Sequence, residues 1–304
     1  MTPTYSFLSI GECMIEMSGG GETGLWRMGF AGDTLNTLWY AKAGLDPKDG
    51  PVAYLTALGT DGFSDKILAF LEENGIATDL IRRVSDRRPG LYMIEQRDGD
   101  RRFTYWRETS AARCLADDPD HLDKALDAAR LVYFSGITLA ILPPPKRADL
   151  IDRLTRARAA GKIVAYDPNI RPVLWEDERT LADTIMRGAG AASIVLPSFD
   201  DEARAFGDGT PADTVERYRA AGAELVAVKN GGAPVLVDSG TDRSEIATQS
   251  DVAVVDATGA GDSFNGAFLA AFLNGASAAD AARAGCATAA RVVATQGALI
   301  RPAS

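Results

Sequence analysis

Histidine, cysteine and long hydrophobic runs are all scarce in this sequence of 304 residues. His121 is the single histidine, which excludes most zinc-enzyme ligand sets and disfavours a Ser/His/Asp triad. The three cysteines are widely spaced and form no CxxC pair, so neither a disulfide scaffold nor a cysteine zinc site is expected. The longest uncharged run, residues 263–279, is interrupted by Asn and Gly, so no membrane span is expected. The N-terminus has no signal-peptide pattern, and a cytoplasmic location is predicted.

Positive charge is also in deficit. The chain has 42 acidic and 32 Lys or Arg residues, a formal net charge of −10. A protein this acidic is repelled by phosphate backbones and anionic membranes, so neither nucleic acid nor membrane is expected as a partner. With 46% hydrophobic residues, the length suits one large α/β domain over residues 1–304.

From about residue 130 onward, short apolar segments alternate with helical periodicity, which predicts a parallel sheet covered by helices on both faces. The predicted strands of this part are 131–136, 163–167, 194–196, 224–229 and 234–238, and the predicted helices are 144–160, 177–189, 199–206, 211–221, 261–274 and 277–294. Before residue 80 the prediction is strands 7–10 and 53–58 with helices 34–43 and 64–74.

Two insertions, about 13–31 and 86–112, predict a small β-sheet appendage. Residues 90–107 read as a hairpin around Asp98-Gly99, a favoured two-residue turn, so that paired residue numbers sum to 197. Tyr92, Tyr105 and Arg107 then share one face and could hold an anion such as a carboxylate. An arginine-rich, solvated hairpin with aromatic cross-strand packing explains the same pattern equally well.

A glycine-rich turn gives the strongest phosphate-site signal. In the segment Asp256–Asp262, DATGAGD, Gly259 and Gly261 precede an apolar helix whose N-terminus can bind an anion. Asp262 lies at the mouth of this anion hole, although helix capping is the alternative explanation. A second match, GxGxxG at residues 19–24, lacks a following helix and is interpreted as a loop between strands.

Further polar groups follow predicted strands, where ligand residues of α/β folds gather. They are the segment Asp167–Arg171, the pair Ser198 and Asp201, and Lys229 with Gly231 and Gly232. Asp33 and Asn36 share one face at the start of a helix. Each group taken singly is also explained by turns, caps or surface positions.

At DATGAGDSFNGAFLA the chain resembles the ribokinase-like (PfkB) carbohydrate kinases, and the likeness runs its whole length through GDTLNTLWYAKAG (32–44) and the block at 54–76. Within the family, the segments at 11–16, 90–113, 135–142 and 167–175 resemble the 2-keto-3-deoxygluconate kinase group. The resemblance implies a roughly nine-stranded, mostly parallel sheet between helices, with a small β lid. It also implies ATP-dependent phosphorylation, here of 2-keto-3-deoxy-D-gluconate at O6.

The resemblance assigns roles to matching positions. Asp262 would be the catalytic base, and Ala257 to Gly261 the anion hole. The implied sugar contacts are Gly32, Asp33, Asn36 and, at the acid end, Tyr92, Tyr105, Arg107 and Arg171. The implied ATP contacts are Asn169, Ser198, Lys229, Gly231, Gly232, Ala257, Gly259 and Gly261, with Asn265, Cys286 and Ala289 in the adenine pocket, whereas Ala260 belongs to the anion hole.

Two departures from the family pattern concern the metal and the anion hole. The Asn-x-x-Glu motif that organises Mg²⁺ through water reads Ser198-x-x-Asp201 followed by Glu202, which leaves two candidate carboxylates. Ala257 stands where the signature has Thr, which removes a hydroxyl but keeps the backbone.

Several hypotheses about the chain remain open. The helix dipole at Asp262 predicts a carboxylate that stays ionised and is therefore a weak base. The alternative functions are a kinase for a neutral sugar such as fructose and a non-catalytic sugar-acid sensor. The exposed face of the lid predicts a homo-oligomer, a dimer or higher.

Overall fold

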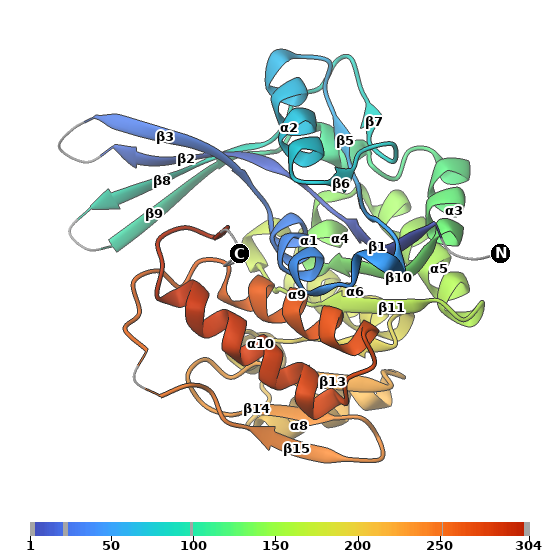
Figure 1. Ribbon diagram of the computed structural model, residues 1–304. Coiled ribbons are helices and arrows are strands. Elements are labelled where there is room, and N and C mark those ends of the chain that lie inside the picture. Colours follow the sequence, from blue (N-terminus) through green and yellow to red (C-terminus); the bar gives the residue numbers. More distant parts are fainter. Residues whose placement is uncertain (1–3, 21–23, 98–99, 251, 301–304) are drawn as a thin grey trace.

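The computed structural model describes residues 4–20, 24–97, 100–250 and 252–300 (Figure 1). Within these ranges a nine-stranded sheet has the order β15-β14-β13-β12-β11-β10-β1-β4-β6. Its strands are β1 (Tyr5–Ile10), β4 (Val52–Leu55), β6 (Ile76–Ala77), β10 (Ala129–Ser135), β11 (Ile163–Asp167), β12 (Ile194–Val195), β13 (Leu225–Val228), β14 (Val235–Asp238) and β15 (Arg243–Ile246). Neighbours from β6 to β13 pair in parallel, and β13, β14 and β15 pair antiparallel. The predicted fold class, α/β with a mostly parallel sheet, is confirmed.

Helices cover both faces of this sheet. One face carries α3 (Pro119–Ala128), α4 (Gly136–Ile141), α5 (Pro144–Ala159), α6 (Glu178–Ala191), α7 (Phe199–Phe206) and α8 (Pro211–Ala220). The other carries α1 (Asp33–Gly44), α2 (Gly62–Glu73), α9 (Ala260–Leu273) and α10 (Ala278–Val293). Short 3-10 turns lie at Pro47–Asp49, Ala111–Cys114 and Pro172–Leu174, and β5 (Ala57–Leu58) pairs with β7 (Arg82–Arg83).

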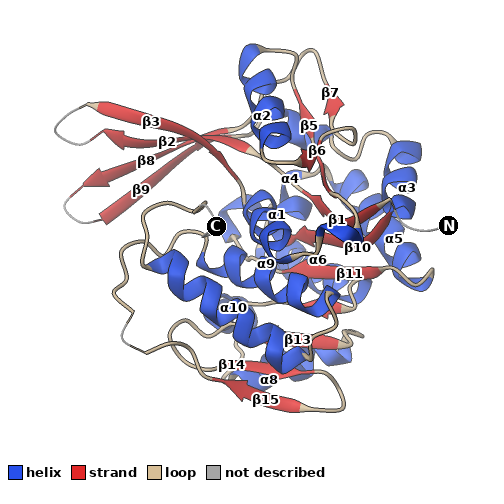
Figure 2. Cartoon of the chain, in the orientation of Figure 1, coloured by secondary structure: helices blue, strands red, loops and turns tan. Residues whose placement is uncertain are grey.

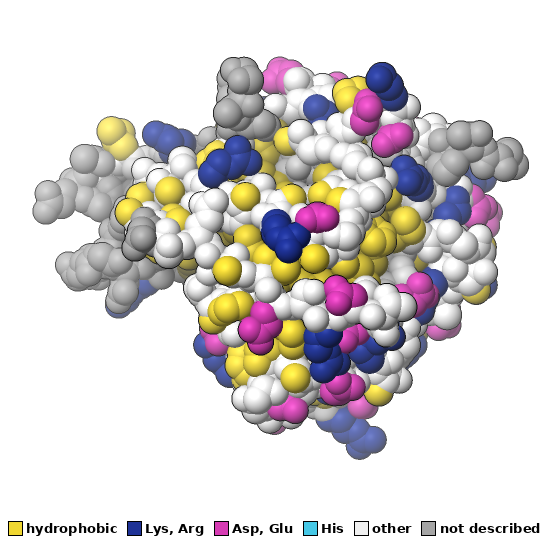
Figure 3. Space-filling model, turned by 60° about the horizontal axis from the view of Figure 1, so that its bottom comes forward, with side chains coloured by type: hydrophobic (Ala, Val, Ile, Leu, Met, Phe, Trp, Pro, Cys, Tyr) yellow, Lys and Arg dark blue, Asp and Glu magenta, His cyan; other side chains and the backbone are white. Residues whose placement is uncertain are grey.

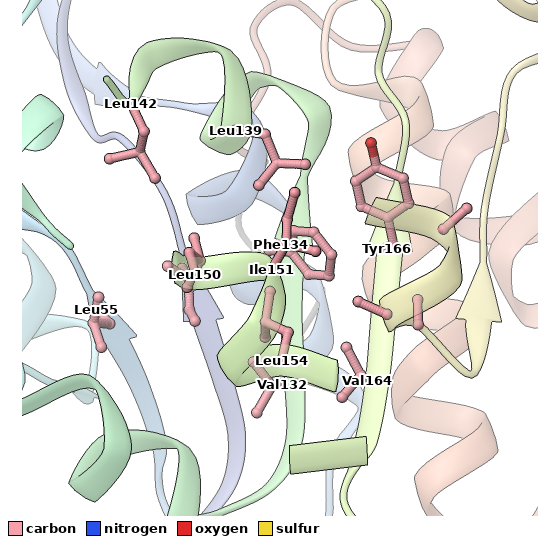
Figure 4. Packing of buried hydrophobic residues seen from close by; sticks show 14 of the residues in the cluster. Leu55, Val132, Phe134, Leu139, Leu142, Leu150, Ile151, Leu154, Val164 and Tyr166 are labelled. Carbon is pink, nitrogen blue, oxygen red and sulfur yellow. The ribbon is translucent and has the colours of Figure 1, made fainter. Parts of the chain in front are cut away.

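Strand residues divide between two buried clusters by the period of two. In β10, Val132 and Phe134 join the α5 face, whereas Leu131 and Tyr133 join the α1 and α9 face. Figure 4 shows the first cluster, in which the rings of Phe134 and Tyr166 lie against each other, with centroids 4.6 Å apart. Burial on both faces explains why these strands read as continuous apolar runs.

A second sheet of four strands projects from the body (Figure 2). Its order is β3-β2-β8-β9, with β2 at Met14–Gly20, β3 at Leu25–Ala31, β8 at Leu91–Arg97 and β9 at Asp100–Trp106. Tyr92 pairs with Tyr105 and Arg97 with Asp100, so the predicted register holds, although the turn residues 98–99 lie outside the described residues. We call this sheet the lid.

Most predicted helices and strands are present with ends shifted by a few residues. The sequence prediction did not identify β6, β7 or β15 as strands, and it included β2 only as part of the β insertion at 13–31. In the described ranges, none of the helices combines the length and hydrophobicity that a membrane span requires.

Candidate active site

The glycine turn caps α9 as the sequence predicted. Gly259 is the N-cap of α9 and has φ 76°, a left-handed conformation that favours glycine. A Cβ atom there would lie 3.0 Å from the Ala298 carbonyl oxygen. Within the described chain, the backbone N–H groups of Gly259, Gly261 and Asp262 have no protein acceptor, as expected at a helix N-terminus. The turn therefore offers several donors to an anion.

Asp262 lies half-buried in the first turn of α9. Its Oδ2 accepts a hydrogen bond from Asn36 Nδ2 at 2.8 Å. Burial, followed by the negative charge of Asp33, raises the pKa of Asp262 to about 7, against the lowering effects of Asn36 and Lys229. The expectation of a weakly basic carboxylate was wrong, because burial and neighbouring carboxylates outweigh the helix dipole. A carboxyl group with this pKa is suited to proton transfer near neutral pH.

The start of α1 faces the same region. Gly32 precedes α1, and a Cβ atom there would lie 2.0 Å from the Glu12 carbonyl oxygen, so this close crossing requires glycine. Asp33 Oδ2 accepts a hydrogen bond at 2.9 Å from Nδ2 of Asn169, which follows β11 and has φ 34°. Asn tolerates this left-handed conformation better than most residues. Elements far apart in sequence therefore place Asp33, Asn36 and Asn169 beside Asp262.

A buried network lies beneath the glycine turn. Lys229 Nζ donates to Asp167 Oδ2 at 2.8 Å and to Asn265 Oδ1 at 3.0 Å. Asn265 Nδ2 donates to Asp167 Oδ2 at 2.6 Å and to the Tyr133 hydroxyl at 3.2 Å. A Cβ atom on Gly261 would lie 3.6 Å from Lys229 Nζ, so the ammonium group lies next to the anion hole. The Asp167 carboxylate and the Asn265 amide hold the ammonium group there.

A cavity of about 500 Å³ opens beside Lys229 on the α10 side. Eight predicted ATP-contact residues line it together with Ala260: Ser198, Lys229, Gly231, Gly232, Ala257, Gly261, Cys286 and Ala289. The rest of the wall is mostly apolar, including Val252, Val254 and Phe264. Figure 3 shows the face that carries α10, where hydrophobic side chains gather among scattered charged ones. The cavity can therefore accommodate a base on apolar walls and phosphates at its glycine end.

Three predicted ATP contacts do not line this cavity, and one of them, Gly259, lies in the glycine turn that caps α9. Asn265 is fully buried in the network with Asp167, so its assignment to the adenine pocket is corrected. Asn169 does not line the cavity and instead contacts Asp33 on the α1 side. Helix periodicity explains the first correction, because the face of α9 that carries Asn265 packs against the sheet.

The lid presents the predicted aromatic face. Tyr92 stacks on Tyr105 with ring centroids 5.7 Å apart, and Phe103 stacks on both rings. The Tyr92 hydroxyl donates a hydrogen bond to Glu16 Oε2. Burial raises the pKa of the Tyr105 phenol, against the opposing positive charges of Arg107 and Arg171. Of the two arginines predicted to bind the acid end, Arg107 and Arg171, the first has its guanidinium carbon 5.9 Å from the centre of the Tyr105 ring.

Each of these arginines already has a carboxylate partner. Arg107 Nη2 pairs with Glu12 Oε2, and both side chains are almost fully buried. Arg171 Nη1 pairs with Asp201 Oδ2 at 3.1 Å in a more exposed position. The sequence did not predict these partners, since Glu12 was noted only within the GECMIE motif and ion pairs between distant segments leave no local pattern.

The two candidate metal-organising carboxylates differ in position. Glu202 is fully buried, bonded to Tyr218 and Arg217, and burial raises its pKa to about 7. It is therefore part of the packing beneath α7, and its assignment as a candidate metal residue is corrected. Asp201 remains partly exposed, three residues beyond Ser198 at the cavity.

The larger cavity, about 720 Å³, lies elsewhere along the lid. Its walls come from β2, β3, α1, α2 and the segment 296–299, and include Glu16, Arg27, Trp39, Phe70 and Glu73. In the described chain, it is lined by none of the predicted sugar contacts. Chemistry therefore places the candidate active site between the lid, α1 and the smaller cavity rather than in the larger of these two cavities.

Comparison with known proteins connects this geometry to a family. The model of the pfkB family carbohydrate kinases matches residues 6–303. The chain is 39% identical to the 2-dehydro-3-deoxygluconokinase of Dickeya dadantii (strain 3937), over 98% of this chain and 97% of that protein.

Solved structures agree with these sequence matches. The PfkB protein from Polaromonas sp. JS666 superposes with a TM-score of 0.82 and 27% identity, covering 95% of this chain and 96% of that one. The fructokinase with bound ATP from Xylella fastidiosa superposes with a TM-score of 0.80 and 26% identity, covering 97% and 94%.

Proposed function

The chain belongs to the PfkB family of carbohydrate kinases, and we propose that it transfers the γ-phosphoryl group of ATP to O6 of 2-keto-3-deoxy-D-gluconate. The product is 2-keto-3-deoxy-6-phosphogluconate. The similarity to 2-dehydro-3-deoxygluconokinases over nearly the whole chain supports this substrate. The observation that carries the proposal is the position of Asp262, where the glycine turn, α1 and the smaller cavity meet.

Asp262 acts as the general base. Its carboxylate accepts the proton of the attacking hydroxyl as the new O–P bond forms and the bond to the ADP oxygen breaks. The N–H groups of Gly259 and Gly261 hold the transferring group, and Lys229 places a positive charge beside it. Because the transition state is loose, positioning and charge stabilisation provide most of the catalysis.

The acid end of the substrate lies under the lid. Arg171 binds the carboxylate, because its guanidinium is partly exposed and it follows Asn169, whose side chain bonds to Asp33. Arg107 contributes from its buried position beside Tyr105, whose ring lies 5.9 Å from the guanidinium carbon. Asp33 and Asn36 contact sugar hydroxyls at the reacting end.

The residues present fit a magnesium ion that is carried by the nucleotide. Within the described chain, no cluster of three or more His, Cys, Asp or Glu side chains could form a metal cage. Mg²⁺ is commonly held by phosphates, waters and one or two carboxylates, and Asp201 is the partly exposed carboxylate near the cavity. When bound, the ion would neutralise part of the negative charge of the phosphates.

The outer face of the lid supports a dimer. Met28, Met17 and Met93 form one row across three strands, and Trp106 lies next to that row. Met28 and Trp106 are 40% and 50% exposed, an unusual apolar surface for an isolated sheet face. We expect the lid of a second copy of the chain to cover this face. Each chain would form a single domain into which the lid is inserted. Trp106→Glu should give monomers in analytical ultracentrifugation, whereas an unchanged mass would contradict this interface.

An ADP-release assay tests the function. The panel is 2-keto-3-deoxygluconate, its galactonate epimer, fructose, ribose and adenosine. The expected result is strong preference for a sugar acid. Equal activity on fructose would favour the neutral-sugar kinase, and binding of the acid without turnover would favour a sensor.

A further inference from the structure

The two arginine pairs beside the lid differ in their freedom to change partner. Arg107 and Glu12 are 8% and 1% exposed, whereas Arg171 and Asp201 are 48% and 21% exposed. A buried pair is costly to separate because a desolvated charge is left alone, but water compensates an exposed pair. Arg171 is therefore the arginine that can exchange its carboxylate.

Arg171 also lies between the two halves of the site. It follows β11 two residues after Asn169, whose side-chain amide donates to Asp33 at the sugar end of the site at 2.9 Å. Its partner Asp201 lies in the first turn of α7, which begins immediately after Ser198 at the nucleotide cavity. The backbone N–H of Phe199 donates to the Lys229 carbonyl at 2.8 Å, so the start of α7 is attached to the cavity wall.

We propose that Arg171 is shared between two carboxylates: that of Asp201 in the unliganded protein, and that of the sugar acid in the complex. The inference rests on the proposed function, because it requires an acidic substrate. A substrate carboxylate is the natural bidentate partner of a guanidinium. On binding, it takes the guanidinium from Asp201 and leaves that carboxylate, next to the nucleotide cavity, with Arg204 at 3.7 Å as its remaining charged partner.

Competition has a direct consequence for affinity. In the unliganded protein Asp201 occupies one edge of the guanidinium, and its negative charge repels an incoming carboxylate. Asp201 therefore weakens binding of the acid in the absence of nucleotide. It has no such effect on a neutral ketose, which does not need Arg171.

Calorimetric titration without nucleotide or magnesium tests this exchange. 2-keto-3-deoxygluconate is titrated into the wild type, Asp201→Asn and Asp200→Asn, with fructose as the neutral ligand. Asp200 is an exposed acid in the same turn for which no contact to Arg171 is found among the described residues, so its variant controls for net charge. We expect Asp201→Asn to bind the acid roughly three- to tenfold more tightly, with Asp200→Asn unchanged.

A double-mutant cycle isolates the shared guanidinium. In an Arg171→Ala background, Asp201→Asn should no longer change the affinity for the acid. Thermal unfolding of each variant verifies the fold, and Asp201→Ala provides a second replacement. Unchanged or weaker acid binding in folded Asp201→Asn, or equal tightening in Asp200→Asn, would overturn the exchange. Failure of the wild type to bind the acid would instead reject the proposed substrate.

Discussion

The nucleotide half and the sugar half of the site are built in different ways. The smaller cavity is lined largely by glycine, alanine and valine, so its shape comes from backbone and small side chains. The sugar half consists of polar side chains bonded to each other across distant elements. Its pairs are Asn36 with Asp262, Asn169 with Asp33, Arg107 with Glu12, and Arg171 with Asp201.

The difference teaches that substitutions in the two halves act through different causes. In the nucleotide half, an added atom displaces backbone donors. In the sugar half, a removed group leaves its partner unpaired, and the cost depends on how deeply that partner is buried.

The largest effect is expected at Asp262, where the halves meet. Asp262→Asn keeps the shape but cannot accept a proton, so kcat should fall by about 10²–10⁴-fold with ATP affinity retained. The folded-state pKa of about 7 exceeds the ordinary value of 3.8, so ionisation of Asp262 opposes folding between these values. The variant's Tm should therefore exceed that of the wild type, by a margin that grows as pH rises from 4 to 7. A kcat within about threefold of wild type would leave Asp262 only a structural role in the first turn of α9.

Arg107→Ala tests the buried pair of the sugar half. The substitution leaves the Glu12 carboxylate uncompensated, so the free energy of unfolding should fall by about 3–5 kcal/mol. Arg171→Ala is the matched control, because loss of its exposed pair should cost at most about 1 kcal/mol. Urea unfolding measures both, and similar losses would show that burial does not distinguish the pairs.

Gly259→Ala tests the nucleotide half. The added Cβ conflicts with φ 76° and approaches the Ala298 carbonyl, so the turn and its N–H donors should shift. A donor displaced from the transferring group should lower kcat by about 10²-fold. Gly275→Ala is the control: Gly275 has φ 91°, follows the other end of α9 and has open space around it. An equal loss of kcat in both would indicate general backbone strain.

How far the sequence predicts this molecule depends on the range of the interaction. A two-residue turn fixes the lid register, so the pairing of Tyr92 with Tyr105 followed from Asp98-Gly99 alone. Gly231 and Gly232 follow a strand and line the smaller cavity, and their contact with ATP stays a prediction.

The errors concern interactions that only the tertiary structure creates. The pKa of Asp262 depends on Asp33 and Asp167, which are distant in sequence, so the local helix dipole gave the wrong direction. Asn265 follows Phe264, which lines the cavity, but its own side chain points to the sheet and bonds to Asp167. Glu202 is indistinguishable by sequence from Asp201 until its burial is known.

A smaller effect is expected at the exposed pair. Arg171→Ala should raise KM for the sugar acid about tenfold, because a hydrogen bond between charged groups contributes roughly 1.5–3 kcal/mol. Activity on fructose should change far less. Arg204→Ala is the control, since Arg204 also lies near Asp201, at 3.7 Å, but is more exposed. An equal rise in KM for fructose would remove Arg171 from recognition of the acid.

The smallest effect separates two roles of Asn36. Its side-chain amide donates to Asp262 and thereby lowers the pKa of that carboxyl group, against burial and the charge of Asp33. Asp262 must be ionised to accept a proton, so kcat/KM should rise with pH and level off above about 7. Asn36→Ala removes the donor, and the acidic limb should move to higher pH by about one pH unit. If Asn36 only contacted a sugar hydroxyl, KM would rise and the limb would stay in place. Thr37→Ser, at the next position of α1, is the control, and a limb that stays in place in Asn36→Ala would show that Asn36 does not tune the base.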